Sequence, residues 1–349
     1  MDLTPYSWSR HLKIMLGTLA ALLLIAATLV LIANPYGNLP WAPLRHVLMD
    51  DNQRFQYPAI IRSQRYDSLV IGTSTSRLLE PTQLERVFGG RFANLALNSG
   101  TPWEQWQVAR LFAREIAAPK TLVVGLDHVW CTHDADEKRI TARGFPDWMF
   151  DSNPWNDIAY MLNARTLEIA GRRIGHALDR VKERWPHNGY EVFVPPEHDY
   201  DLARARGHIY GTAVPPPANL RARRPAPPIP SDGFPALPWI EDLLAARGFE
   251  RVVLLITPVH VAAQPKPGQP AYVREQRCKM ELARIAGRHG NAIIDFRIPS
   301  PITREDSNYW DSVHYRVPIA TRIVSDLAKA ITSSADDPDG DWRVLRAAP

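Results

Sequence analysis

The sequence predicts an α/β protein with a mostly parallel sheet. A single N-terminal membrane helix precedes the sheet in the chain. Three observations support this. Short apolar runs alternate with amphipathic helical segments, a long uncharged segment lies near the N-terminus, and polar residues follow the apolar runs. The chain has 349 residues, 45% of them hydrophobic and 22% charged. That length and composition are enough to bury a large core.

Residues 14–33 read IMLGTLAALLLIAATLVLIA and carry no charge. At a rise of about 1.5 Å per residue, this segment matches a hydrocarbon core of about 30 Å. We expect a retained anchor; the alternative is a cleaved signal peptide, whose apolar region is usually about 7–15 residues. Arg10 and Lys13 precede the segment, and only Arg45 follows closely. This charge bias favours a cytoplasmic segment 1–13, with the remainder of the chain exported across the membrane.

Five short apolar runs predict the strands of one sheet, at residues 68–71, 92–97, 121–125, 251–257 and 292–296. Helical periodicity or helix start signals lie between them, at residues 81–88, 102–116, 240–247, 272–289 and 318–331. Continuous apolar strands that alternate with helices are typical of a parallel sheet buried on both faces. We therefore expect one three-layer α/β/α domain, formed by residues 67–126 and 239–333.

The other segments interrupt or flank this domain. Residues 34–66 form a juxtamembrane segment, and residues 334–349 are polar and expected to be disordered. Residues 127–238 form a large insert, with helical periodicity at 156–184 and a candidate strand at 190–194. Its segment 214–238 is rich in proline, which excludes a regular helix or a central strand. We interpret this segment as a connector; a polyproline ligand for a partner is the alternative.

Polar residues follow each predicted strand, at the sheet edge where parallel sheets bind ligands. Ser74 follows the first strand, and the segment after the fifth strand carries Asp311 and His314. A serine becomes a good nucleophile when a histidine takes its proton and an acid orients that histidine. We predict Ser74 as the nucleophile, His314 as the base and Asp311 as its orienting acid. Helix capping is the alternative for Ser74, and Ser76 is the competing hydroxyl.

The order of these motifs resembles that of the SGNH/GDSL hydrolase superfamily. Gly72-Thr73-Ser74 is similar to its first block, residues 94–100 (NLALNSG) to its second, and Asp311-Ser312-Val313-His314 to its last. The resemblance covers residues 66–126 and 250–332, and implies an SGNH/flavodoxin-like fold. It also implies an oxyanion hole formed by the backbone N–H groups of Ser74 and Gly100.

Two positions depart from the pattern of this superfamily. Thr73 stands where many members have aspartate, and Asp127 stands where the third block has asparagine. An ionised carboxylate cannot donate a hydrogen bond to an oxyanion. The chain therefore looks more like a divergent branch of membrane-anchored, exported acyl-transfer proteins. Some of these act in O-acetylation of bacterial exopolysaccharides, and others act in D-alanylation of teichoic acids.

This resemblance implies an O-acyltransferase or esterase that transfers acetyl or other acyl groups to a cell-surface polysaccharide, or removes them. Its expected partner is a polytopic membrane acyl exporter, and no cofactor or metal is expected. The alternative is a catalytically silent module that binds polysaccharide or scaffolds an export complex. A net charge of +4 without a concentrated basic patch argues against nucleic-acid binding.

Five further residues carry open interpretations. Arg77, Asp127 and His260 are candidate substrate contacts; an ion pair for Arg77 and strand-end packing for His260 are the alternatives. Cys131 and Cys278 are the only cysteines, and their spacing fits no metal motif. They form either a disulfide or buried free thiols.

Overall fold

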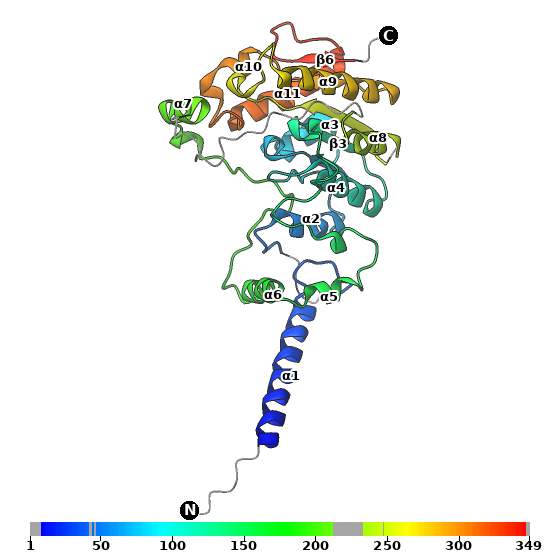
Figure 1. Cartoon of the computed structure of the whole chain (residues 1–349), viewed down its shortest axis with the longest axis vertical. Coiled ribbons are helices and arrows are strands. Elements are labelled where there is room, and N and C mark those ends of the chain that lie inside the picture. Colours follow the sequence, from blue (N-terminus) through cyan, green and yellow to red (C-terminus); the bar gives the residue numbers. More distant parts are fainter. Residues whose placement is uncertain (1–7, 42–43, 45–46, 212–232, 247, 347–349) are drawn as a thin grey trace, which may run out of the picture. The chain divides into compact units, whose positions relative to one another are not determined.

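A computed structural model describes residues 8–41, 44, 47–211, 233–246 and 248–346. The chain forms two compact units (Figure 1). One consists of Met1–Asp51 and Pro146–Trp185, and the other of Asn52–Phe145 and Pro186–Pro349. Residues 146–185 of the predicted insert therefore pack with the N-terminal segment, and the other described residues of the insert belong to the same unit as the sheet.

The larger unit contains a six-stranded sheet in the order β2-β1-β3-β4-β5-β6. The first five strands are parallel, and β6 is antiparallel to β5. This confirms the α/β class and the mostly parallel sheet, with one strand more than the five predicted. The strands are β1 (Ser68–Ile71), β2 (Phe92–Asn94), β3 (Thr121–Leu126), β4 (Arg251–Ile256), β5 (Ile293–Asp295) and β6 (Arg343–Leu345).

The extra strand β6 lies in the tail that the sequence predicts to be disordered. Trp342, which precedes it, is only 3% exposed and belongs to the hydrophobic core. Arg343 places its Nε 3.1 Å from Oδ2 of the buried Asp295 on β5. The prediction of disorder is therefore wrong for this strand, because one buried aromatic ring and one ion pair hold a polar segment in place. Residues 347–349 lie outside the described part.

Apolar side chains cover both faces of the sheet. Val70 and Val123 belong to a buried cluster that includes residues of α3 (Pro81–Phe88) and α11 (Val317–Ser333). Their neighbours Leu69 and Leu122 are also buried, and alternate strand residues point to opposite faces. The other helices of this unit are α2 (Gln53–Arg62), α4 (Pro102–Glu115), α7 (Leu202–Tyr210), α8 (Leu237–Ala245), α9 (Pro270–Arg288) and α10 (Pro301–Arg304).

The insert differs from its prediction in two places within this unit. Residues 190–194 form no strand, and α7 is a helix that the periodicity did not indicate. Helix α8 begins at Leu237, with Pro238 in its first turn, where a missing N–H costs no helical hydrogen bond. Residues 214–232 of the proline-rich segment lie outside the described residues, so the connector interpretation stays a prediction.

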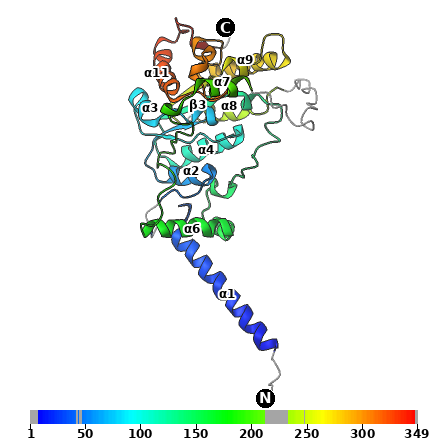
Figure 2. The ribbon, with the colours of Figure 1, turned by 90° about the vertical axis from the view of Figure 1, so that its left-hand side faces the viewer.

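The N-terminal unit contains α1 (Trp8–Ala33), which is long and apolar enough to cross a membrane and has few buried residues. It also contains α5 (Asp157–Met161) and α6 (Ala164–Ala177) in place of the one long helical segment predicted at 156–184. The side chain of Asn163 accepts the N–H of Thr166 and starts α6 as a separate helix. Figures 1 and 2 show α6 lying across the C-terminal end of α1.

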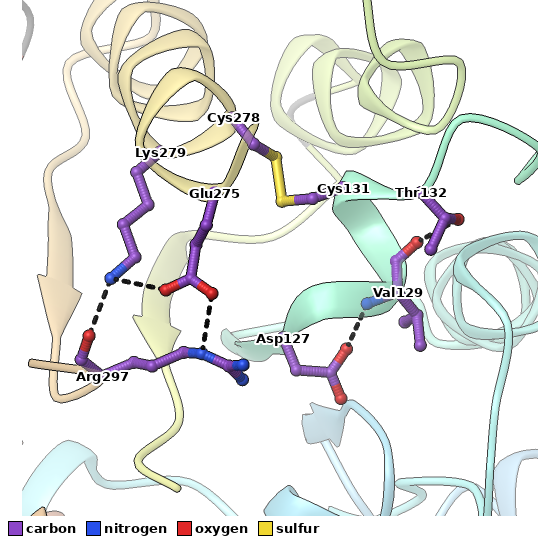
Figure 3. Close-up of a disulfide and its surroundings, with 8 residues drawn as sticks. All are labelled: Asp127, Val129, Cys131, Thr132, Glu275, Cys278, Lys279 and Arg297. Atoms are coloured by element: carbon purple, nitrogen blue, oxygen red, sulfur yellow. Dashed lines mark hydrogen bonds and ion pairs between the residues drawn. A yellow bond between two sulfur atoms is a disulfide. The ribbon is translucent and has the colours of Figure 1, made fainter. Parts of the chain in front are cut away.

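A disulfide joins Cys131 and Cys278, which settles the alternative that the sequence left open. Figure 3 shows that it links the turn after β3 to helix α9, beside Glu275 and Lys279. The bridge closes a sequence separation of 147 residues. Such a bridge restricts the unfolded chain strongly.

Removing this disulfide is expected to lower the free energy of unfolding by about 2–5 kcal/mol. The reason is the gain in conformational freedom of the unfolded chain. Urea unfolding of detergent-solubilised protein should show the same loss after reduction and in a Cys131→Ser, Cys278→Ser double variant. Equal stability of the oxidised and reduced forms would contradict the bridge as a stabilising element.

Candidate active site

The structure brings together the three residues predicted as nucleophile, base and acid. Ser74 Oγ lies 2.9 Å from His314 Nε2, and His314 Nδ1 lies 2.8 Å from Asp311 Oδ2. All three side chains are partly exposed. A hydrogen-bonded serine, imidazole and carboxylate in this order can carry out nucleophilic catalysis at a carbonyl group.

Ser74 begins a short 3-10 turn (Ser74–Ser76) directly after β1. Two glycines let this turn approach the sheet, because a Cβ atom at Gly72 or Gly125 would overlap the Ser76 side chain. Ser76 is 0% exposed as a result. The competing hydroxyl therefore packs between β1 and β3, and Ser74 is the serine that faces the histidine.

The loop after β5 fixes the acid and the base. Asp311 Oδ1 accepts the backbone N–H groups of Val313 and His314, at 2.7 and 2.8 Å. Burial raises the pKa of Asp311, but hydrogen bonds from the His314 ring and from these N–H groups outweigh it, so this pKa lies below its usual value. The carboxylate accepts from Nδ1, which leaves Nε2 of a neutral ring to accept the Ser74 proton.

Contacts between neighbouring residues join the two segments that carry Ser74 and His314. The buried Tyr315 donates its hydroxyl to the carbonyl of Thr75, so the residues next to His314 and Ser74 are joined. The ring of Phe193 packs edge-on against the His314 ring, with 5.3 Å between centroids. Phe193 comes from the insert, and no sequence motif indicated its place at the site.

Arg77 is a buried side chain that contacts other residues of the site. Its guanidinium is buried and donates to Asn98 Oδ1 at 2.8 Å and to Glu191 Oε2 at 2.7 Å. It also lies 4.7 Å from the centroid of the Phe193 ring. Ion pairing and stacking therefore occupy the side chain, which corresponds to the structural alternative rather than to direct substrate contact.

The two residues that depart from the superfamily pattern contact each other. Thr73 donates its hydroxyl to Asp127 Oδ2, and Asp127 Oδ1 accepts the N–H of Val129 at 3.1 Å. Hydroxyl contacts continue from Thr73 to Thr75 and from Thr75 to Thr257. Through these contacts Asp127 joins the ends of β1, β3 and β4. Because it is buried, its carboxylate is not exposed for contact with a substrate.

The predicted oxyanion glycine has a different role. The Gly100 N–H donates to the carbonyl of Leu97 at 3.1 Å within a tight turn, so the structure does not support its prediction as an oxyanion donor. In the same turn, Asn98 Oδ1 accepts a hydrogen bond from Arg77, and the backbone N–H of Asn98 donates to Gln53 Oε1. Among the residues that the structure describes, no acceptor is found for the Asn98 side-chain NH₂ group or the Ser74 N–H. These two groups are candidate oxyanion donors.

His260 is buried beside the Asp311–His314 loop and makes three hydrogen bonds. Its Nε2 lies 3.1 Å from Asp306 Oδ1, its Nδ1 accepts the N–H of Ala262, and its own N–H donates to the carbonyl of Ser312. The rings of Tyr210 and Tyr309 pack edge-on against it. His260 therefore positions the Asp311–His314 loop instead of touching substrate.

Acidification is expected to weaken this brace. Burial lowers the pKa of His260 from its ordinary value of 6.5, and the nearby Asp306 carboxylate offsets this only in part. Below pH 6.5 the His260 ring binds a proton more readily in the unfolded chain than in the folded protein. The contribution of the neutral His260 ring to the free energy of unfolding is therefore present above pH 6.5 and is lost as the pH falls. Urea unfolding at pH 7.5 and 5.5 should show a smaller pH dependence in His260→Gln than in the wild type. Identical pH dependence would contradict this role.

A cavity of about 510 Å³ lies beside the Asp311–His314 loop. Val313, the neighbour of His314, forms part of its wall, together with His128, Val259, Arg274, Glu275 and Arg297. Figure 3 shows Glu275 and Arg297 paired in this region. In the described part of the chain, no group of three His, Cys, Asp or Glu side chains is placed to hold a metal ion.

Comparisons with known proteins add no assignment to this geometry. No protein-family model matches the chain, and no curated protein matches it. The functional interpretation therefore depends on the residues and contacts described above.

Proposed function

We propose that the sheet unit is an SGNH-type acyl-ester enzyme with a Ser74–His314–Asp311 triad. The observation that carries this proposal is the pair of hydrogen bonds, 2.9 and 2.8 Å long, that connect these side chains in the required order. The parallel strand order 2-1-3-4-5 agrees with a three-layer, flavodoxin-like arrangement. Ser74 follows β1, next to the point where that order reverses.

In the proposed mechanism, Ser74 Oγ attacks the carbonyl carbon of an acyl ester while His314 Nε2 takes its proton. Asp311 holds the ring in the correct tautomer and stabilises the imidazolium that forms. The tetrahedral oxyanion collapses to an acyl-serine, and His314 returns the proton to the departing oxygen. A sugar hydroxyl or water then attacks the acyl-serine by the same steps in reverse.

Two further features support an envelope location. Helix α1 is long and apolar enough to span a membrane, and disulfides persist mainly in oxidising compartments such as the periplasm. We propose a single-pass protein of the bacterial inner membrane whose sheet unit is exported. Its proposed substrate is a cell-surface polysaccharide that gains or loses acyl groups. For transfer, the polysaccharide hydroxyl is the acceptor and a polytopic acyl exporter is the donor-side partner.

Ester turnover tests the chemistry directly. Full-length protein in detergent is expected to hydrolyse a chromogenic acetyl ester, and a fluorophosphonate probe is expected to label Ser74, identified by peptide mass. Ser76→Ala should retain both properties, because that buried hydroxyl does not face His314. Absence of both turnover and labelling would overturn the proposal.

The side chain of Asn98 gives a test of the oxyanion hole. Asn98→Ala is expected to lower kcat about 10²- to 10³-fold with little change in KM, the usual cost of losing one oxyanion donor. Ser99→Ala changes the exposed neighbour in the same turn and should behave like the wild type. A normal kcat in Asn98→Ala would contradict this side chain as an oxyanion donor and leave the Ser74 N–H as the remaining candidate.

One observation favours a second candidate function. Asp127 replaces a donor by an acceptor, and the Gly100 N–H is engaged within its turn. A catalytically silent unit that binds polysaccharide or scaffolds an export complex would tolerate both changes. Full restoration of surface polysaccharide acylation in a deletion strain by Ser74→Ala and by His314→Ala would favour this alternative.

A further inference from the structure

The N-terminal unit carries a set of exposed apolar side chains close to the end of α1. They belong to α5, α6 and the adjoining segments; Trp155 and Leu178 are 61% and 60% exposed. We name this set the interfacial face. Its members are Trp155, Tyr160, Leu162, Leu167, Leu178 and Val181.

Helix α6 has three distinct sides. The first packs into the unit and comprises Thr166, Ile169, Ala170 and Arg173. The second is charged and comprises Arg165, Glu168 and Arg172. At 100° per residue, Ala164, Leu167, Gly171 and Leu178 share the third side, which is uncharged and exposed. A helix in contact with water alone would be expected to carry polar residues there.

The charged side of α6 is already bound within the unit. Arg165 lies 3.1 Å from Asp50 Oδ1 and 3.0 Å from Glu168 Oε2. Arg172 lies 2.8 Å from Glu168 Oε1. These ion pairs fix the rotation of α6 about its own axis, so the uncharged side keeps its orientation.

The position of α6 relative to α1 is also fixed. Both helices pack together where Val30 and Ala33 of α1 are buried. Arg173 donates from the buried side of α6 to the carbonyl of Asn34, which lies just past the last residue of α1. A cation at a helix C-terminus is favourable because the carbonyl groups there carry partial negative charge. Figure 2 shows α6 extending across the end of α1.

Aromatic side chains lie at the same end of α1. Trp41 donates its indole N–H to the carbonyl of Leu31, and its ring lies 6.0 Å from that of Trp155. Tryptophan and tyrosine concentrate where a membrane meets water, because their rings are apolar and their edges polar. If α1 spans a membrane, its end at Ala33 lies at this boundary, and so does the interfacial face.

We propose that the interfacial face inserts into the lipid headgroup region of the membrane that α1 crosses. The segment from Trp155 to Val181 thus forms an interfacial platform that lies in the plane of the membrane. The nearby Arg180 and Lys182 are exposed and suit anionic lipid phosphates. This inference depends on α1 as a spanning helix and is independent of the acyl chemistry proposed for the other unit.

Spin labels on the full-length protein in lipid nanodiscs test the platform. Cysteines are introduced singly as Leu167→Cys and Leu178→Cys, while the native cysteines remain protected in their disulfide. Nanodiscs contain phosphatidylethanolamine and phosphatidylglycerol. Both labels are expected to be more accessible to oxygen than to a water-soluble nickel chelate. Leu22→Cys on α1 serves as the membrane reference.

A matched apolar position serves as the aqueous control. Met280 on α9 is 65% exposed in the sheet unit, and Met280→Cys leaves the ion pairs of α6 intact. Its label should favour the nickel chelate. The platform proposal is wrong if the label at residue 22 lies in lipid but the labels at residues 167 and 178 are as accessible to the nickel chelate as the label at residue 280. If the label at 22 is also aqueous, the spanning role of α1 is wrong as well. Ester turnover measured on the same samples reports separately on the acyl chemistry.

Discussion

Replacing Ser74 with alanine is expected to lower ester turnover by about 10⁴-fold or more, the usual cost of losing a triad nucleophile. His314→Ala should cost a similar factor, because among the described residues the group hydrogen-bonded to Ser74 Oγ is His314 Nε2, at 2.9 Å. Initial rates with a chromogenic acetyl ester measure both effects. The double variant should be no slower than either single variant, because residues that act as one unit are not additive.

A matched serine separates this chemical effect from loss of folding. Ser76 lies two residues away and is fully buried, and its hydroxyl has no hydrogen-bond partner in the part of the chain that the structure describes. Ser76→Ala should therefore retain turnover, and circular dichroism should show equal unfolding transitions for the Ser74→Ala and wild-type proteins. Turnover that survives in Ser74→Ala would contradict the proposed nucleophile.

Breaking the buried ion pair between Arg54 and Glu104 is expected to cost about 3–5 kcal/mol of unfolding free energy. The two side chains are almost fully buried and meet through two hydrogen bonds, at 2.9 and 2.6 Å. Arg54→Met leaves the Glu104 carboxylate buried without its cation. Urea unfolding followed by circular dichroism should show the transition at much lower denaturant concentration.

The double variant Arg54→Met, Glu104→Leu is the control for this experiment. It removes both charges, so much of the lost stability should return, although Glu104 also caps α4 by accepting the Thr101 N–H. Arg54 further donates to the carbonyl of Asn98, so Arg54→Met should also lower ester turnover. A double variant as unstable as the single one would show that the uncompensated charge is not the cause.

Much of the fold was accessible from the sequence because its signals are local. The apolar run at 68–71 and the proline at residue 81 define β1 and α3 within their immediate surroundings. The tail and the insert were harder to predict. Strand β6 depends on the burial of Trp342 and on pairing with β5, and Phe193 reaches His314 from an irregular segment. Neither contact has a local periodicity.

By itself, the sequence determined the long uncharged segment near the N-terminus, the alternation that specifies a parallel sheet, and the residues Ser74, Asp311 and His314 as candidates. Only the tertiary structure decided which hydroxyl faces the histidine, because Gly72 and Gly125 create the space that buries Ser76. It also decided that Asp127 and Thr73 bond to each other and that the Gly100 N–H is occupied. The burial of Ser76 and the Thr73–Asp127 bond depend on backbone approach between strands 50 or more residues apart in sequence, which no local pattern encodes. The Gly100 bond forms within its own turn, whose conformation the sequence did not specify.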